Sequence, residues 1–104
     1  MSKRQTKEEF KARVHEWAKK LDMDVRIISM RIMKRKWASY TKATGLLIFN
    51  VELLDKAKEL SDYVIVHELL HSSVPNHGKL WKSIMRAHLG DYERLESRLK
   101  EKVV

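Results

Sequence analysis

Apolar residues recur at helical spacing near the start of the chain. Thr6 and Glu9 form a capping-box pair, and the apolar positions that follow lie three or four residues apart. These positions are Phe10, Val14, Trp17, Ala18 and Leu21. The pattern predicts an amphipathic helix that begins after Thr6 and ends near Leu21.

The next apolar segments have the shorter period of β-strands. Residues 25–33 are rich in β-branched side chains and alternate on either side of a phase slip at Ile27 and Ile28, which indicates a strand with a bulge. Residues 34–44 indicate a polar turn or an irregular second strand. Gly45 then introduces residues 46–50, which favour a further strand, although so short an apolar run also fits a helix.

Three helices are predicted in the second half of the chain. The first runs over residues 63–73, and Ser61-Asp62 supplies its N-cap and an acidic residue for its first turn. The next is capped by Asn76 and ends at Gly90, and the last begins directly after that glycine. Apolar stripes support the last two helices, formed by Leu80, Trp81 and Ile84 and by Tyr92, Leu95 and Leu99.

These elements predict an α+β protein with an N-terminal helix, a small mixed β-sheet, a central helix and one or two C-terminal helices. The 104 residues, 43% hydrophobic and 35% charged, suffice for a single domain over residues 1–104 and exclude a disordered chain. No stretch approaches the roughly 18 apolar residues of a spanning helix, and no apolar signal core begins the chain. We therefore expect a soluble, cytoplasmic protein without a membrane partner. One Gln and two Asn among many charged residues favour a thermophilic source.

The net charge of +8 raises the hypothesis of nucleic-acid binding. Residues 1–52 hold 13 basic and 6 acidic side chains, whereas residues 53–104 hold 9 and 8. One cluster interleaves basic side chains with aromatic ones that can stack on bases, namely Lys34, Arg35, Lys36, Trp37, Tyr40 and Lys42. A basic nucleic-acid-binding module is therefore one alternative, and a solvated basic loop is the simpler interpretation.

The central helix carries the sequence His67-Glu68-Leu69-Leu70-His71. An α-helix turns by about 100° per residue, so His67 and His71 lie roughly 40° apart on one face and can chelate one cation. Two imidazoles favour zinc, and the chain has no cysteine from which to build a thiolate site. Glu68 lies beside this pair and is suited to act as a base rather than as a ligand.

A catalytic zinc needs a third protein ligand and an open position for water. His77 is the best candidate, because the predicted helix break before it lets the chain turn back toward the two histidines. Glu93 and Glu96 are the fallback ligands, whereas His88 lies 11 residues past His77, roughly 16 Å along a helix axis. Two other interpretations stay open: an accidental five-residue match, and a structural zinc, which prefers four ligands and usually cysteine.

Four segments of the chain resemble a known family. They are residues 31–40, residues 45–50, residues 62–71 with the two histidines, and the sequence Asn76-His77-Gly78-Lys79-Leu80-Trp81. Together they resemble the YgjP-like and minigluzincin metallopeptidases, which are zincins of minimal size, over about residues 25–85. Ala38 and Tyr40 depart from the family pattern, which commonly has Gly and Cys around the tryptophan.

The resemblance implies a minimal zincin-like fold and roles for several residues. His77 corresponds to the family's third zinc ligand. The strand before the active-site helix binds substrate along its edge in the family, and here it corresponds to Leu46, Leu47, Ile48, Phe49 and Asn50. Family members are also zymogens blocked by their own C-terminal segments, which implies a regulatory tail at about residues 100–104.

The motif and the resemblance together predict a zinc-dependent metalloendopeptidase with one zinc ion per chain, held by His67, His71 and His77. Glu68 is expected to activate the zinc-bound water as general base. Tyr63, one turn before His67, is a packing residue or a stabiliser of the transition state. The expected partner is a peptide or unfolded protein substrate, and a metal-binding protein with little proteolytic activity is the other alternative.

Overall fold

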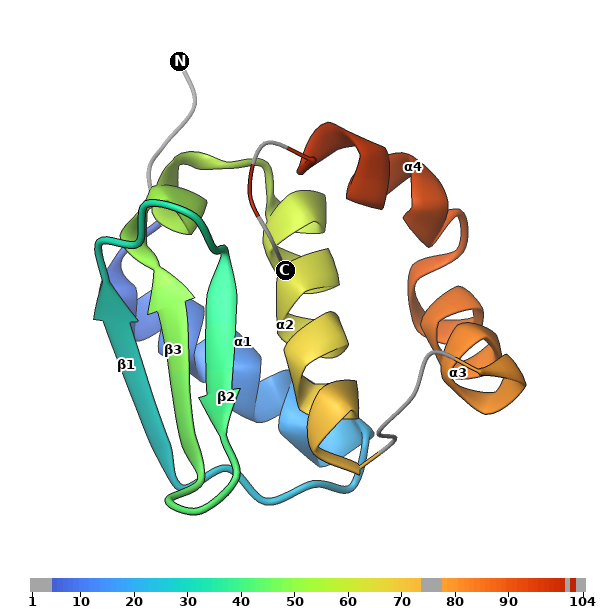
Figure 1. Cartoon of the computed structure of the whole chain (residues 1–104), viewed down its shortest axis with the longest axis horizontal. Coiled ribbons are helices and arrows are strands. Elements are labelled where there is room, and N and C mark those ends of the chain that lie inside the picture. Colours follow the sequence, from blue (N-terminus) through green and yellow to red (C-terminus); the bar gives the residue numbers. More distant parts are fainter. Residues whose placement is uncertain (1–4, 74–77, 101, 103–104) are drawn as a thin grey trace.

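The computed structural model describes residues 5–73, 78–100 and 102. Figure 1 shows the order of its elements, which are α1 (Lys7–Lys20), β1 (Ile27–Arg31), β2 (Ala38–Thr41), β3 (Leu46–Asn50), the 3-10 helix η1 (Val51–Asp55), α2 (Lys58–Ser73), α3 (Lys79–Leu89) and α4 (Tyr92–Arg98). The predicted α+β class, with a small mixed sheet and two helices after the central one, is confirmed.

The three strands form one mixed sheet in the order β1-β3-β2. β3 pairs in parallel with β1 and antiparallel with β2, so both edges of β3 carry hydrogen-bonded partners. The prediction that residues 46–50 offer an open edge is therefore wrong. The turn before β3 folds it back against β2, and the apolar residues on both faces of β3 suit a central strand. The free edges described belong to β1 and β2.

One face of the sheet packs against the helices. Leu47 and Phe49 of β3 are buried, and the Phe49 ring meets Phe10 of α1 edge to face at 5.1 Å between centroids. Figure 1 shows α1 crossing behind the sheet and α2 standing beside β2. The apolar core thus lies between the sheet and these two helices and continues into buried residues of α3 and α4, and it fixes α2 next to the β2 edge.

The capping box predicted at the start of α1 is present. The Glu9 amide donates to Thr6 Oγ1 at 3.0 Å, and the Thr6 amide donates to the Glu9 carboxylate at 2.9 Å. The prediction held because it depends only on residues within one turn.

Helix α2 begins at Lys58, earlier than the predicted N-cap at Ser61 and Asp62, and that boundary was wrong. The amides of Leu60 and Ser61 already donate to the Ala57 carbonyl, at 3.0 and 3.2 Å. The buried Ser61 hydroxyl donates to the Leu53 carbonyl at 3.0 Å, and Asp62 accepts from the Trp17 indole at 3.0 Å and from Arg13. Both residues hold neighbouring elements instead of capping the helix.

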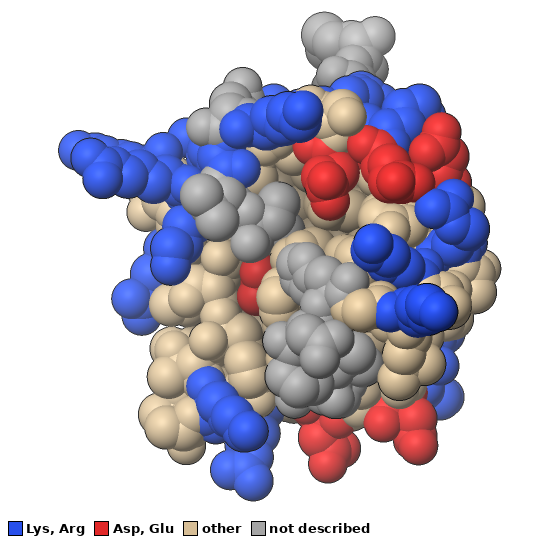
Figure 2. Space-filling view, turned by 45° about the vertical axis from the view of Figure 1, so that its right-hand side comes forward, with Lys and Arg blue, Asp and Glu red and all other residues tan. Residues whose placement is uncertain are grey.

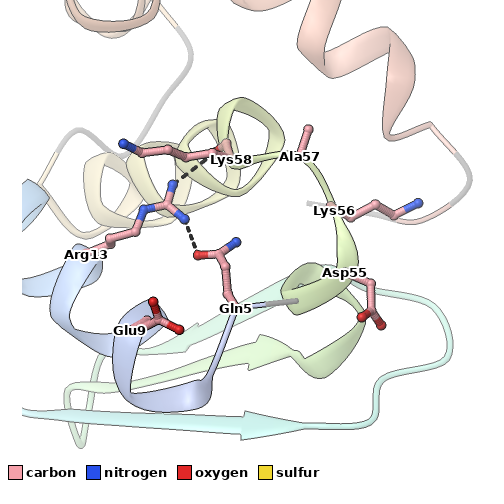
Figure 3. A pocket seen from close by; sticks show the side chains of 7 residues that line it. All are labelled: Gln5, Glu9, Arg13, Asp55, Lys56, Ala57 and Lys58. Carbon is pink, nitrogen blue, oxygen red and sulfur yellow. Dashed lines mark hydrogen bonds between the residues drawn. The ribbon is translucent and has the colours of Figure 1, made fainter. Parts of the chain in front are cut away.

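A hollow of about 530 Å³ lies where α1 and α2 both begin. Figure 3 shows Arg13 reaching across it, with hydrogen bonds to the Gln5 side chain and to the Lys58 carbonyl. Lys58 precedes His67 by nine residues, roughly 13 Å along the helix axis. This hollow is therefore a structural junction, distant from the histidine motif.

Helices α3 and α4 pack along α2. α3 ends at Gly90, whose φ of +64° suits a residue without a side chain, as the sequence predicts. The N-cap of α3 is Gly78, and the predicted cap Asn76 lies outside the described residues. Arg94 and Arg98 of α4 pair with Glu59 at the start of α2, at 3.4 and 2.9 Å. α4 is thereby attached to the helix that carries the motif.

Asn50 connects the end of β3 to the loop before β2, a role that the sequence did not indicate. Its fully buried amide donates to the carbonyls of Met33 and Lys36 at 2.7 and 2.9 Å, and its oxygen accepts from the Glu52 amide at 3.0 Å. Predicted as part of a substrate-binding edge, Asn50 is instead an internal anchor.

Asn50→Ala should lower the free energy of unfolding by about 2–4 kcal/mol, because it leaves two loop carbonyls and one amide without their partner. Urea unfolding followed by circular dichroism measures the change. Thr41→Ala, at an exposed position of β2, is the matched control and should alter stability by no more than about 0.5 kcal/mol. An Asn50→Ala protein as stable as the control variant would contradict the anchoring role.

Candidate active site

The two histidines of the motif lie together on one face of α2. The His67 and His71 ring centroids are 4.5 Å apart, with an angle of 60° between the planes. His67 is 5% exposed, while His71 is half-buried and closer to the helix end. Val64, Ile65 and Val66 are buried just before them, so core packing holds this helix face in place. The spacing expected from sequence is thus realised as a pair of adjacent imidazoles.

Glu68 is a buried carboxyl group next to this pair. It is 5% exposed, and its Oε1 lies 4.0 Å from His67 Nδ1. Burial raises the pKa of Glu68 to about 7, although the positive charge of Lys36 acts in the opposite direction. A carboxyl group with this pKa can accept and release a proton near neutral pH, which is the property of a general base.

Aromatic rings surround the His67 imidazole. The Trp81 ring lies 5.2 Å from it, edge to face, and Tyr92 in turn lies 5.8 Å from Trp81. Trp81 is 2% exposed and comes from α3, so α3 contributes a buried ring to the surroundings of the motif. These contacts limit the movement of His67 and exclude water from one side of it.

Tyr63 also packs against His67, with 5.6 Å between ring centroids, but its hydroxyl group is engaged elsewhere. The residue is fully buried, and its hydroxyl donates to Glu96 of α4 at 2.9 Å. Burial, together with Glu96, raises the pKa of Tyr63 above its usual value. Of its two predicted roles, this geometry favours packing over transition-state stabilisation.

The third ligand predicted from sequence, His77, lies outside the described residues. Within residues 5–73, 78–100 and 102, no group of three His, Asp or Glu side chains is arranged to hold a metal ion. The fallback ligands have other contacts: Glu93 pairs with Arg86 at 2.8 Å, and Glu96 accepts from Tyr63. His88 packs against Trp17 at 5.8 Å. The described part of the chain therefore supplies two imidazoles and one buried carboxylate.

The strand beside the motif is β2, and one of its edges is unpaired among the described strands. The sequence pattern predicts a turn or an irregular strand over residues 34–44. The open edge was predicted on the following strand, residues 46–50. Strand order depends on which segments pair over long distances, and no local pattern in residues 38–50 reveals it. The effect of Lys36 on Glu68 is a second feature that the sequence did not signal.

A family model matches residues 1–102 of the chain, and its description is "YgjP-like, metallopeptidase domain". The chain belongs to the YgjP-like metallopeptidase family. It is accordingly a metallopeptidase, and its family implies a catalytic metal, typically zinc. The HExxH sequence lies on α2, the helix held between the sheet, α3 and α4.

Two crystal structures are similar to this YgjP-like chain. One is the metallopeptidase zymogen of Methanocaldococcus jannaschii jannalysin, with 28% identity and a TM-score of 0.78, covering 88% of this chain and 94% of jannalysin. The other is the metallopeptidase zymogen of Pyrococcus abyssi abylysin, with a TM-score of 0.73 over 91% of this chain and 99% of abylysin. At 17% identity, abylysin supports the fold alone. No curated protein sequence matches the chain.

The aromatic part of the nucleic-acid hypothesis finds no support in the geometry. Trp37 is fully buried, and its indole donates to the Leu99 carbonyl at 2.8 Å, so its ring is not available to stack on a base. Tyr40 is half-buried against the core. Separately, no helix within the described residues is long and apolar enough to cross a membrane.

Proposed function

We propose that this member of the YgjP-like family is a zinc-dependent metalloendopeptidase built from the single domain of residues 1–104. The observation that carries the proposal is the buried carboxyl group of Glu68 next to the paired rings of His67 and His71. Elemental analysis together with an assay on an unfolded protein substrate tests it. A loaded protein that holds zinc but does not cleave would instead be the metal-binding protein of low proteolytic activity.

His67, His71 and His77 would hold one zinc ion per chain. The donor set fits, because adjacent imidazoles on one helix turn suit zinc and the sequence offers no thiolate alternative. The buried carboxyl group of Glu68 lies beside the pair and can accept a proton near neutral pH, because burial raises its pKa to about 7. A bound zinc ion supplies Lewis acidity toward a water molecule and toward the scissile carbonyl.

Glu68 would act as the proton carrier in peptide hydrolysis. Its carboxylate accepts a proton from the attacking water and returns that proton to the leaving amine. Its low exposure keeps the pKa high enough for both steps near neutral pH. Trp81 and Tyr63 both pack against His67 and restrict its ring, so their contribution is to position it.

A peptide or an unfolded protein segment would bind in extended form along the unpaired edge of β2 (Ala38–Thr41). This edge replaces the one first expected at residues 46–50, because β2 lies next to α2 whereas β3 is enclosed between two strands. Main-chain hydrogen bonds to β2 give affinity without demanding a particular sequence. Substrates lacking fixed structure meet this requirement, since their backbone groups are free to pair.

The C-terminal tail, about residues 100–104, would restrain activity. The Trp37 indole holds the Leu99 carbonyl at 2.8 Å, and the Lys102 ammonium donates to the Lys34 carbonyl at 2.8 Å. Lys34 and Trp37 lie in the loop before β2, so the described end of the chain is attached where a substrate would enter. The similar jannalysin structure is that of a metallopeptidase zymogen, which is consistent with a latent form of this chain.

Removal of residues 101–104 should raise kcat/KM for an unfolded protein substrate several-fold, because it frees the entrance beside β2. Steady-state cleavage of a labelled, unfolded protein measures the effect. Lys100→Ala, an exposed change that keeps the tail, is the control and should leave activity at the level of the full chain. Equal activity of the truncated and full chains would show that the tail has no inhibitory role.

A further inference from the structure

The sheet and its loops form a segment with basic side chains only. Residues 25–51 contain six Lys and Arg and no Asp or Glu. They are Arg26, Arg31, Lys34, Arg35, Lys36 and Lys42. In Figure 2 the left margin of the molecule, where the sheet lies, carries blue side chains and no red ones. An extended substrate on β2 therefore lies on a segment whose charged side chains are all basic.

The β2 register determines which substrate side chains turn toward the protein. Tyr40 pairs with Leu47 of β3, and both belong to or pack against the core on the face that meets α2. Side chains of adjacent strands at the same level point to the same face. A substrate residue aligned with Tyr40 on the free edge of β2 thus directs its side chain toward this face.

A cavity of about 420 Å³ opens on that face, at the end of the sheet where β2 turns into β3. Its apolar wall comes from Leu47 and from Leu69 of α2, the residue after Glu68, with Tyr40 beside them. Three charged side chains complete the lining: Arg26, Lys42 and Asp24. The cavity is thus connected to the proposed substrate edge through Tyr40 and to the motif helix through Leu69.

The two cations of this cavity are available for a ligand. Within the described residues, the side chains of Arg26 and Lys42 take part in no hydrogen bond or ion pair, and both residues are exposed at the cavity mouth. Gly45 lets Arg26 lie flat across the turn, since a Cβ at this position would come within 3.1 Å of Arg26 Cδ. The φ of Gly45, +71°, also favours glycine. Because the lining contains two basic side chains and only one carboxylate, that of Asp24, the cavity has a net positive charge.

We propose that this cavity selects substrates with an acidic side chain, which Arg26 and Lys42 bind when the peptide lies along β2. This inference deepens the proposed peptidase function and rests on it for the cleavage measurements. An acidic side chain gains two ionic contacts there, while its stem covers Tyr40 and Leu69. Because the contacts are partly solvated, the selectivity is moderate and falls as salt concentration rises.

The test compares peptides that differ by a single Glu, Gln or Lys, placed in turn at each position around the scissile bond. The wild-type chain should prefer Glu to Gln about tenfold in kcat/KM at one position, and Lys should be the poorest residue there. The double variant Arg26→Glu/Lys42→Glu should invert this order in favour of Lys. Lys7→Glu/Lys19→Glu on the exposed side of α1 changes the net charge equally and should keep the wild-type preference.

Direct binding of the same labelled peptides, followed by fluorescence anisotropy, separates the two proposals. Cleavage that is indifferent to charge, and equal in all variants, would overturn the acidic preference while the peptidase function stands. Charge-dependent binding without cleavage of any peptide would support the preference and overturn the peptidase function. If the protein cleaves no peptide and its binding does not depend on charge, both the peptidase function and the acidic preference are overturned.

Discussion

Glu68→Gln should reduce kcat for an unfolded protein substrate by at least about a hundredfold while the protein keeps its zinc. The amide has almost the same shape as the carboxyl group but cannot accept the proton of the attacking water, and loss of a general base costs about 10² to 10⁴ in rate. Because Glu68 is proposed to carry a proton and not to bind the metal, the metal content should stay at about one zinc per chain. Elemental analysis and steady-state cleavage on the same preparation give both values.

The same substitution should change the pH dependence of stability in metal-free protein. The pKa of Glu68 is raised from 4.5 to about 7 by burial, so the folded state holds a proton that the unfolded state releases. The contribution of this group to wild-type stability is therefore fully present below pH 4.5 and decreases by about 3 kcal/mol as the pH rises from 4.5 to 7. The free energy of unfolding of Glu68→Gln should not show this decrease over the same pH range.

The control for both measurements is Glu16→Gln on the exposed surface of α1, which should alter neither activity nor the stability profile. Glu68→Gln protein that cleaves at the wild-type rate would exclude Glu68 as the general base. Loss of zinc in Glu68→Gln would instead indicate that the carboxylate is a ligand.

Local patterns were sufficient for some parts of the fold. The capping box of Thr6 and Glu9 and the C-terminal glycine at position 90 were predicted correctly, because a helix end is determined by residues within one turn. The adjacency of His67 and His71 likewise follows from helix geometry alone. These features need no knowledge of the tertiary structure.

Other features depend on contacts between distant residues. Ser61 resembles an N-cap in sequence, but it binds the Leu53 carbonyl once η1 packs against α2. In sequence, Asn50 resembles the last residue of a substrate-binding strand. In the structure, its side-chain amide donates hydrogen bonds to the Met33 and Lys36 carbonyls and so holds their loop in place. Neither role is visible before the strands are paired, which is also why the open edge was assigned to β3 instead of β2.

His71→Ala should weaken zinc binding by at least about a hundredfold and abolish cleavage, because it removes one of two adjacent imidazoles from the donor set. Titration of metal-free protein with zinc in the presence of a competing chelator measures the affinity. The fold should persist, since His71 is half-buried near the helix end and its removal opens no large cavity. His15→Ala, at an exposed position of α1, is the matched control and should bind zinc as the wild type does.

The third ligand is tested in the same titration. His77→Ala should weaken zinc binding to a similar degree, whereas Glu93→Gln and Glu96→Gln should leave the affinity within about twofold of the wild-type value. The reason is that Glu93 already pairs with Arg86 and that Glu96 accepts the Tyr63 hydroxyl, so neither carboxylate is directed to the histidine pair. If Glu96→Gln releases the metal and His77→Ala does not, the zinc site is a two-histidine, one-glutamate centre, and the proposed ligand set is wrong.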